Sequence, residues 1–242
     1  MISELIESAT FEDWSRACER RAVKSGVWPV LLEGVWDPDE PMDPGSLERT
    51  AEYDAGELLV KWWREHAGPY QELGEEEDGE EDEESRRERL GVIAPFGDEW
   101  PGLAPGIGPT QDPDEVASEL GDVLLSIKDD LHLGLIDARS GAEALVVLRW
   151  GGATNYCSTP EIAAVVASWE RRFGARVVRL EFDVLQLSVA APPTTLGEAL
   201  LIAAEHFAFC PDNIWQGYED AQSIQEYAEK LVGQESWIFW WD

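Results

Sequence analysis

The segment that most restricts the fold of this chain is an acidic run at residues 71–84. It contains ten acidic residues and no basic one, and Leu73 is its single large apolar side chain. Such a stretch cannot bury enough apolar surface to offset the entropy that is lost on ordering. We therefore expect a disordered, self-repelling acidic loop over residues 71–89 that separates the folded parts of the chain.

Three further regions follow from the hydrophobic patterns on either side of this loop. Residues 1–70 predict helices over 3–24 and 55–66 and a short strand at 27–32, which Pro29 favours as an edge strand. Residues 90–142 hold a loop rich in Gly and Pro and then a helix that Asp112 caps and Pro113 begins. Residues 143–242 are the most regular part, and we expect them to form the main domain.

The order of elements in residues 143–242 predicts the fold class. The apolar run 144–150 is typical of a strand buried on both faces, and a helix follows from Thr159 to Gly174. Residues 176–182 and 185–189 alternate as a hairpin, helices follow from Thr195 onward, and residues 237–241 predict a last strand. We expect an α+β two-layer sandwich with a mainly antiparallel sheet, ferredoxin-like (split βαβ) in this half.

The charge of the chain limits its partners. There are 18 basic and 50 acidic residues, a formal net charge of −32. A chain of this charge repels nucleic acid and anionic lipid, and its densest basic group, Arg171, Arg172, Arg176 and Arg179, lies among glutamates. We expect a protein partner, with a basic one best complementing the charge, and neither nucleic acid nor membrane.

The sequence shows no pattern of a membrane span, a signal peptide or a cysteine-based metal site. No apolar run approaches the ~20 residues of a membrane span, and the first residues are acidic where a signal peptide is basic. The three cysteines, Cys18, Cys157 and Cys210, form no CxxC pair, so neither a disulfide framework nor a standard zinc site is indicated. We expect a cytoplasmic protein with reduced thiols and no cofactor.

Several long segments of the C-terminal half resemble a known family. They are residues 150–156, 168–176, 187–195 and 205–213 and the closing Trp240-Trp241-Asp242. Together they are similar to the bacterial family catalogued as domain of unknown function 4253, common in actinobacteria. The resemblance covers about the last hundred residues and extends upstream to residues 27–32 and 100–105. It implies no chemistry, because the family has no function to carry over.

The densest set of reactive side chains lies in residues 205–213. Glu205, His206 and Cys210 fall within six residues at a predicted helix end, and Asp212 lies in the turn that follows. His206 and Cys210 are four residues apart and share a helix face, which permits a His-activated thiolate or two metal ligands. A buried structural Cys and a His at a helix C-terminus would give the same pattern. Structure, catalysis and metal binding all stay open here.

A second candidate is the loop at Gly151, Gly152 and Asn155, between a predicted strand and a helix. Exposed N–H groups in such a loop, together with a helix N-terminus, can hold an anion. The loop lacks both the GxGxxG pattern and the GK[ST] ending of phosphate loops, and tight-turn glycines explain it equally well. It predicts a small-ligand or anion sensor, or else a simple turn.

No complete catalytic constellation is present, so a non-enzymatic function is favoured. We expect an interaction protein that binds another macromolecule, in the manner of an immunity protein or antitoxin, through an acidic surface rich in Trp. The chain has twelve tryptophans, some beside Pro/Gly-rich loops, although Trp can equally close the core. The alternatives are an enzyme or metal-binding protein at residues 205–212 and a ligand sensor at residues 151–155.

Overall fold

The computed structural model describes residues 1–24, 26–34, 45–69, 82–216 and 221–242. The chain forms two compact units, each built from separate stretches of sequence. We call them the sheet unit (Met1–Ala55, Gly106–Pro192 and Gln234–Asp242) and the helical unit (Gly56–Pro105 and Pro193–Gly233). Both units therefore combine segments from before and after residue 90.

The sheet unit is built on one six-stranded sheet. Its strands lie in the order β1-β3-β2-β4-β5-β6, and only the β2–β4 pair is parallel. The α+β class with a mainly antiparallel sheet is thus confirmed. The strand bounds are Ile2–Ile6 (β1), Trp28–Leu32 (β2), His132–Ile136 (β3), Ala175–Leu180 (β4), Val184–Val189 (β5) and Ser236–Trp240 (β6).

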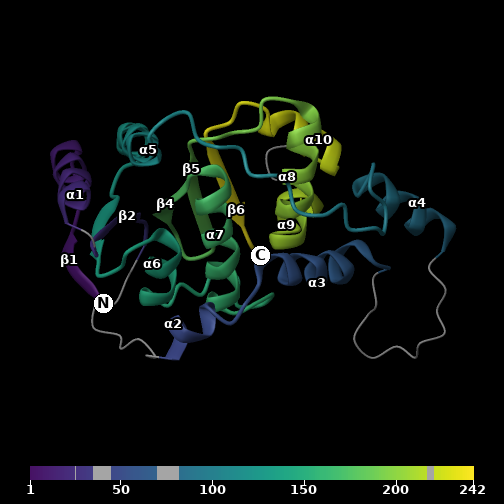
Figure 1. Cartoon of the computed structure of the whole chain (residues 1–242), viewed down its shortest axis with the longest axis horizontal. Coiled ribbons are helices and arrows are strands. Elements are labelled where there is room, and N and C mark those ends of the chain that lie inside the picture. The colour runs from purple at the N-terminus through teal and green to yellow at the C-terminus, as the bar shows by residue number, and fades with distance from the viewer. Residues whose placement is uncertain (25, 35–44, 70–81, 217–220) are drawn as a thin grey trace. The chain divides into compact units, whose positions relative to one another are not determined.

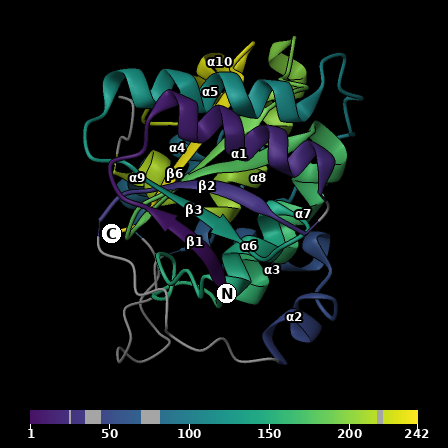
Figure 2. The same ribbon diagram turned by 90° about the vertical axis from the view of Figure 1, so that its left-hand side faces the viewer.

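Helices pack on both faces of this sheet (Figure 2). On one face lie α1 (Phe11–Val23) and α5 (Pro113–Ile127), side by side. On the other lie α6 (Gly141–Val147) and α7 (Thr159–Phe173), which α2 (Gly45–Thr50) contacts. Because both faces are covered, β2 and β5 are buried along their whole length.

Trp14 of α1 is the largest side chain between the helices and the sheet on the α1–α5 face. It is 1% exposed, and its indole Nε1–H donates to the Ser118 carbonyl of α5 at 3.0 Å. A Cβ on Gly121 of α5 would lie 2.1 Å from the indole ring, so only glycine lets α5 approach this closely. Leu31 and Val178 of the sheet complete this part of the core.

Aromatic packing fills the opposite face. Trp169 of α7 stacks on Phe239 of β6, with ring centroids 5.2 Å apart and planes 11° from parallel. Trp237 packs edge-on against the same indole at 5.7 Å. Such pairs add to the free energy of simple area burial.

In the helical unit, the described residues form helices α3, α4, α8, α9 and α10 (Figure 1), and aromatic side chains pack in its core. Trp63 packs against Phe207 and Trp100, each with ring centroids 5.6 Å away, and Trp62 packs against Phe209. The helix bounds are Ala55–Ala67 (α3), Glu83–Val92 (α4), Leu196–Phe209 (α8), Asp212–Trp215 (α9) and Ile224–Leu231 (α10).

The tryptophans of the described residues serve mainly as core. Only Trp215, at 43%, is among the exposed large apolar side chains. Eight are buried: Trp14, Trp28, Trp62, Trp63, Trp150, Trp169, Trp237 and Trp241. Trp36 lies outside the described residues.

Several sequence predictions are confirmed by the helix ends and the hairpin. Asp112 caps α5 with Pro113 in its first turn, and Gly174 ends α7 in the left-handed conformation at φ +62°. Thr195 and Glu198 form the predicted capping box of α8. β4 and β5 pair as the predicted hairpin, and β6 forms the last strand.

The predicted strand at residues 144–150 is wrong. Residues 144–147 belong instead to α6, whose N-cap Ser140 accepts a hydrogen bond from the Glu143 N–H, and residues 148–150 follow its end. A continuous apolar run fits a helix as well as a strand when all sides are covered, and Ala142–Val147 lacks an exposed residue. The N-cap hydrogen bond of Ser140 favours the helix over the strand.

The predicted ferredoxin-like order is also wrong. Without a strand at residues 144–150, the split βαβ unit lacks its first strand. Moreover, β4, β5 and β6 are consecutive neighbours in the sheet, whereas a split βαβ unit interleaves its strands.

The N-terminal prediction needs two corrections. Residues 2–6 are β1, an edge strand paired with β3, and the helix begins only at Phe11, where Thr10 is the N-cap and forms a capping box with Asp13. β2 is a central strand despite Pro29. The pairing of β2 with β4 is confined to Leu31 and Leu32, so the missing N–H of Pro29 falls outside that ladder.

The predicted acidic loop lies outside the described residues as far as residue 81. Its end is helical instead, because the Asp82 carboxylate accepts from the Glu84 and Ser85 N–H groups and caps α4. Within the described ranges, no helix has the length and hydropathy needed to cross a membrane.

The packing of Trp14 against Gly121 predicts the effect of one added methyl group. Gly121→Ala forces the indole or α5 to move, so the free energy of unfolding falls by about 1–3 kcal/mol despite the better helix propensity of Ala. Gly91→Ala in α4, where a Cβ meets nothing within 4 Å, is the matched control and is neutral or stabilising. Urea unfolding measures both, and an equal response of the two variants would contradict this packing.

Candidate functional site

The predicted reactive segment is placed in the interior of the helical unit. Glu205 and His206 lie in α8, Cys210 is its C-cap, and Asp212 begins α9. Glu205, His206 and Cys210 are fully buried, and Asp212 is 5% exposed. These side chains therefore lie in the interior of the helical unit rather than at its surface.

Hydrogen bonds within the helical unit account for the burial of Glu205, Cys210 and the Nδ1 atom of His206, whereas His206 Nε2 is buried and forms no hydrogen bond with the described residues. The Tyr227 hydroxyl of α10 is 3.1 Å from His206 Nδ1 and accepts from the Asn213 side-chain amide at 3.3 Å. The Cys210 thiol donates to Asn213 Oδ1 at 3.4 Å, and the Glu205 carboxylate accepts from the Ala104 N–H at 2.7 Å. Buried polar groups are hydrogen-bonded in this way in most cores.

His66 of α3 is a neighbour that sequence reasoning did not assign to this group. Burial lowers the pKa of His66 to about 4, although the Asp212 carboxylate opposes the change. His66 lies on the apolar stripe of α3, and this pattern does not predict that His66 is near Asp212, which is distant in the sequence.

The arrangement supports a structural role for this cluster. Cys210 bonds to an amide oxygen, which does not deprotonate a thiol as an imidazole would. Among the described residues, no three His, Cys, Asp or Glu side chains are grouped as metal ligands. The cluster joins α8, α9 and α10 by directional bonds.

The loop at residues 151–155 is a tight turn of the sheet unit. The N–H groups of Thr154 and Cys157 donate to the Gly151 and Ala153 carbonyls at 3.0 and 2.9 Å. A Cβ on Gly152 would lie 2.2 Å from the Trp150 ring, so packing requires this glycine. Asn155 is exposed. Packing thus explains Gly152, and the N–H groups of Thr154 and Cys157 are already used within the turn.

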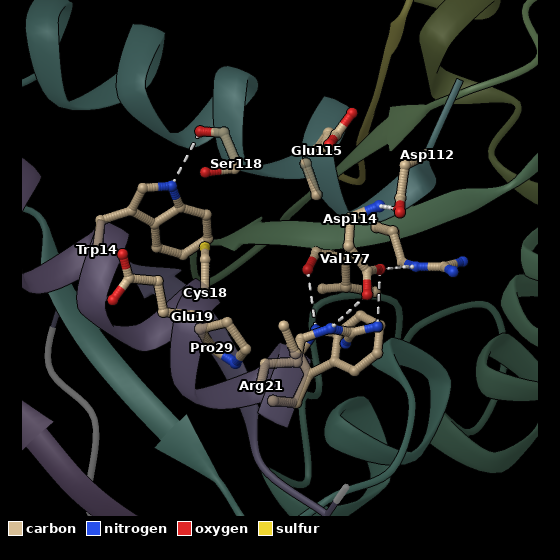
Figure 3. A pocket seen from close by; sticks show the side chains of 14 residues that line it. Trp14, Cys18, Glu19, Arg21, Pro29, Asp112, Asp114, Glu115, Ser118 and Val177 are labelled. Carbon is tan, nitrogen blue, oxygen red and sulfur yellow. Dashed lines mark hydrogen bonds and ion pairs between the residues drawn. The ribbon is translucent and has the colours of Figure 1, made fainter. Parts of the chain in front are cut away.

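A cavity of about 450 Å³ lies elsewhere in the sheet unit, between α1 and α5 and next to β2 and β4 (Figure 3). Its walls combine aromatic, thiol and charged side chains. They are Trp14, Cys18, Glu19, Arg21, Ala22, Trp28, Pro29, Asp112, Asp114, Glu115, Ala117, Ser118, Arg176 and Val177.

A charged network fixes one end of this cavity. Asp114 of α5 accepts from Arg21 of α1 at 2.8 and 3.2 Å and from Arg176 of β4 at 2.7 Å. Burial raises the pKa of Asp114, but the bonds and charges of the two arginines outweigh it and hold the pKa below 3.8. The Arg21 guanidinium also lies 3.5 Å above the Trp28 ring.

The other end of the cavity is formed by Trp14 and Cys18 (Figure 3). Burial raises the pKa of the Cys18 thiol to about 11, so the group is protonated at neutral pH. Glu19 and Glu115 are exposed lining residues, and neither forms an ion pair with any described residue. One wall of the cavity therefore carries paired charges, those of Arg21, Arg176 and Asp114. The carboxylates of Glu19 and Glu115 have no ion-pair partner among the described residues.

No local sequence pattern indicates this cavity. Arg176 belongs to a basic group that lies among glutamates, Trp14 fits the apolar stripe of a helix, and Asp114 fits a helix start. The lining comes from three distant stretches, residues 14–29, 112–118 and 176–177, which only the tertiary fold brings together.

The lowered pKa of His66 predicts a pH dependence of stability. The unfolded chain binds a proton near pH 6.5 and the folded chain near pH 4, so stability is complete above pH 6.5 and falls toward pH 4. Between pH 7 and 5, this group alone lowers the free energy of unfolding by about 2 kcal/mol.

Urea unfolding of His66→Gln at both pH values measures this contribution, because the variant loses less stability than the wild type. His132→Gln in the sheet unit is the control and retains the full loss. A wild-type loss unchanged in His66→Gln would show that other groups cause it.

Comparison with known proteins adds a family match and no function. No curated protein matches the chain, and no solved structure matches it. Residues 132–242, from β3 to the last residue, match the family model described as Domain of unknown function (DUF4253), and the predicted family resemblance is confirmed over this part of the chain.

Proposed function

We propose that this chain is a non-enzymatic binding protein and that the cavity between α1 and α5 is its recognition site. The single observation that carries the proposal is the cavity itself. Its volume of about 450 Å³ falls within the range of about 300–1,000 Å³ typical of small-ligand sites. The bonds among Arg21, Asp114 and Arg176 hold its polar wall in place before any ligand arrives.

The chemistry of the lining supports binding over catalysis. The Cys18 thiol has a pKa of about 11 and is therefore a poor nucleophile at neutral pH. No histidine lines the cavity within the described part of the chain, and Asp114 is fixed by two arginines. The protonated Cys18 thiol and the doubly paired Asp114 are therefore poorly suited to act as a nucleophile or a general base.

A basic protein is the partner that the composition favours. The excess of 50 acidic over 18 basic residues supports attraction of a positively charged surface. Because most described tryptophans are buried, we propose that acidic residues rather than tryptophans form the surface that contacts this partner. The setting that we propose is the cytoplasm, and the family resemblance implies that the cell is bacterial.

Closing the cavity tests the proposed function. Ala22 lines the cavity and is exposed on α1, so Ala22→Phe places a ring across the space. We expect a screen of amines, acids and neutral metabolites to yield a ligand that stabilises the wild type by about 2.7 kcal/mol at 100 times its Kd. Ala22→Phe loses this stabilisation.

Val23→Phe is the matched control, because Val23 is the next residue of α1, 90% exposed and not part of the lining. It retains the response of the wild type. Failure of every compound class, or an undiminished response in Ala22→Phe, would contradict the proposed function.

A further inference from the structure

The charges of the cavity lining indicate the chemistry of its ligand. Two arginines face four acidic residues, Glu19, Asp112, Asp114 and Glu115, so the lining carries an excess of two negative charges. The whole chain, at −32, adds to the negative potential within the cavity. This field repels anions and attracts cations.

The two arginines do not reverse this field, because their charges are already matched. Asp114 bonds to both, and Glu170 of α7 interacts electrostatically with both, although burial raises the pKa of Glu170. Glu170 is itself fixed, since it accepts from the Gly141 and Ala142 N–H groups at 2.8 and 3.3 Å. An incoming anion would have to compete with two carboxylates that are already in place.

Glu19 and Glu115 are the carboxylates that remain for a ligand. Glu19 projects from α1 and Glu115 from α5, so the two helices that border the cavity each present one (Figure 3). Within the described ranges, neither has a cationic partner. The apolar lining beside them, from Ala22, Pro29 and Ala117, suits a short aliphatic chain.

On these grounds we infer that the cavity binds an organic cation, a primary ammonium or guanidinium on an aliphatic chain. This inference rests on the proposed function and specifies its ligand. The same chemistry occurs in free diamines and in the Lys and Arg side chains of a basic protein, so the experiment includes both sources.

Isothermal titration with matched probes tests the inference. The cations are 1,4-diaminobutane and a blocked Gly-Lys-Gly peptide, and the anionic and neutral counterparts are succinate and 1,4-butanediol. We expect both cations to bind the wild type, more weakly as salt is raised, and the two counterparts not to bind. A peptide affinity at least about tenfold above that of the diamine supports a protein side chain as the ligand, and similar or higher diamine affinity supports a free amine.

A pair of double variants locates the binding. Glu19→Gln/Glu115→Gln removes both lining carboxylates and weakens cation binding by about tenfold. Glu12→Gln/Glu119→Gln removes the same charge from exposed positions of the same two helices outside the lining and leaves the affinity within about twofold. Equal weakening in both would mean general attraction to an acidic chain and would overturn the inference.

The remaining outcomes separate the inference from the proposed function. Binding of succinate or butanediol that Ala22→Phe abolishes, without cation binding, would overturn the inference and leave the proposed function standing. Absence of binding by all four probes and by the broader screen would overturn both.

Discussion

The packing of Trp14 against Gly121 is the contact on which the α1–α5 side of the sheet unit depends. The indole fills the space between α1, α5 and the sheet, and its N–H is bonded to the α5 backbone. No side chain larger than glycine fits at position 121, so the close approach of α5 at this point is fixed by sequence. The cavity begins where this packing ends, with Trp14 itself as one wall.

Electrostatics fixes the opposite wall of the cavity. Asp114 joins Arg21 of α1 to Arg176 of β4, and thus links both helices of this face to the sheet through one carboxylate. Partly buried charges are stable only when they are paired, and this pairing leaves the charges of Glu19 and Glu115 unmatched. The binding that we propose therefore depends on the unpaired carboxylates at the cavity rim rather than on the strongest ion pairs of the lining.

The sequence predicted those parts of the fold whose signals are local. Asp112 with Pro113, Thr195 with Glu198, and Gly174 each mark a helix end through bonds or dihedral angles within a few residues. The run at residues 144–150 was misread because its burial on all sides comes from tertiary packing, which erases the periodicity of a helix. Residues 2–6 were misread because their partner, β3, lies about 130 residues away.

The same reasoning explains the outcome for the candidate sites. The proximity of His206 and Cys210 follows from helical spacing, but their burial depends on Tyr227 and Asn213, and so could not be read locally. The cavity needs α1, α5 and β4 in contact and has no motif in the sequence. Sites made by distant elements leave only ordinary core and charge patterns in each segment.

The most direct test of the cavity as a cation site is nuclear magnetic resonance of the tryptophan indole N–H groups during titration with 1,4-diaminobutane. The account predicts saturable shifts of the Trp14 and Trp28 signals, which line the cavity, while those of Trp62 and Trp63 in the helical unit stay unchanged. Unchanged Trp14 and Trp28 signals at saturating amine, or equal shifts of all four, would contradict it.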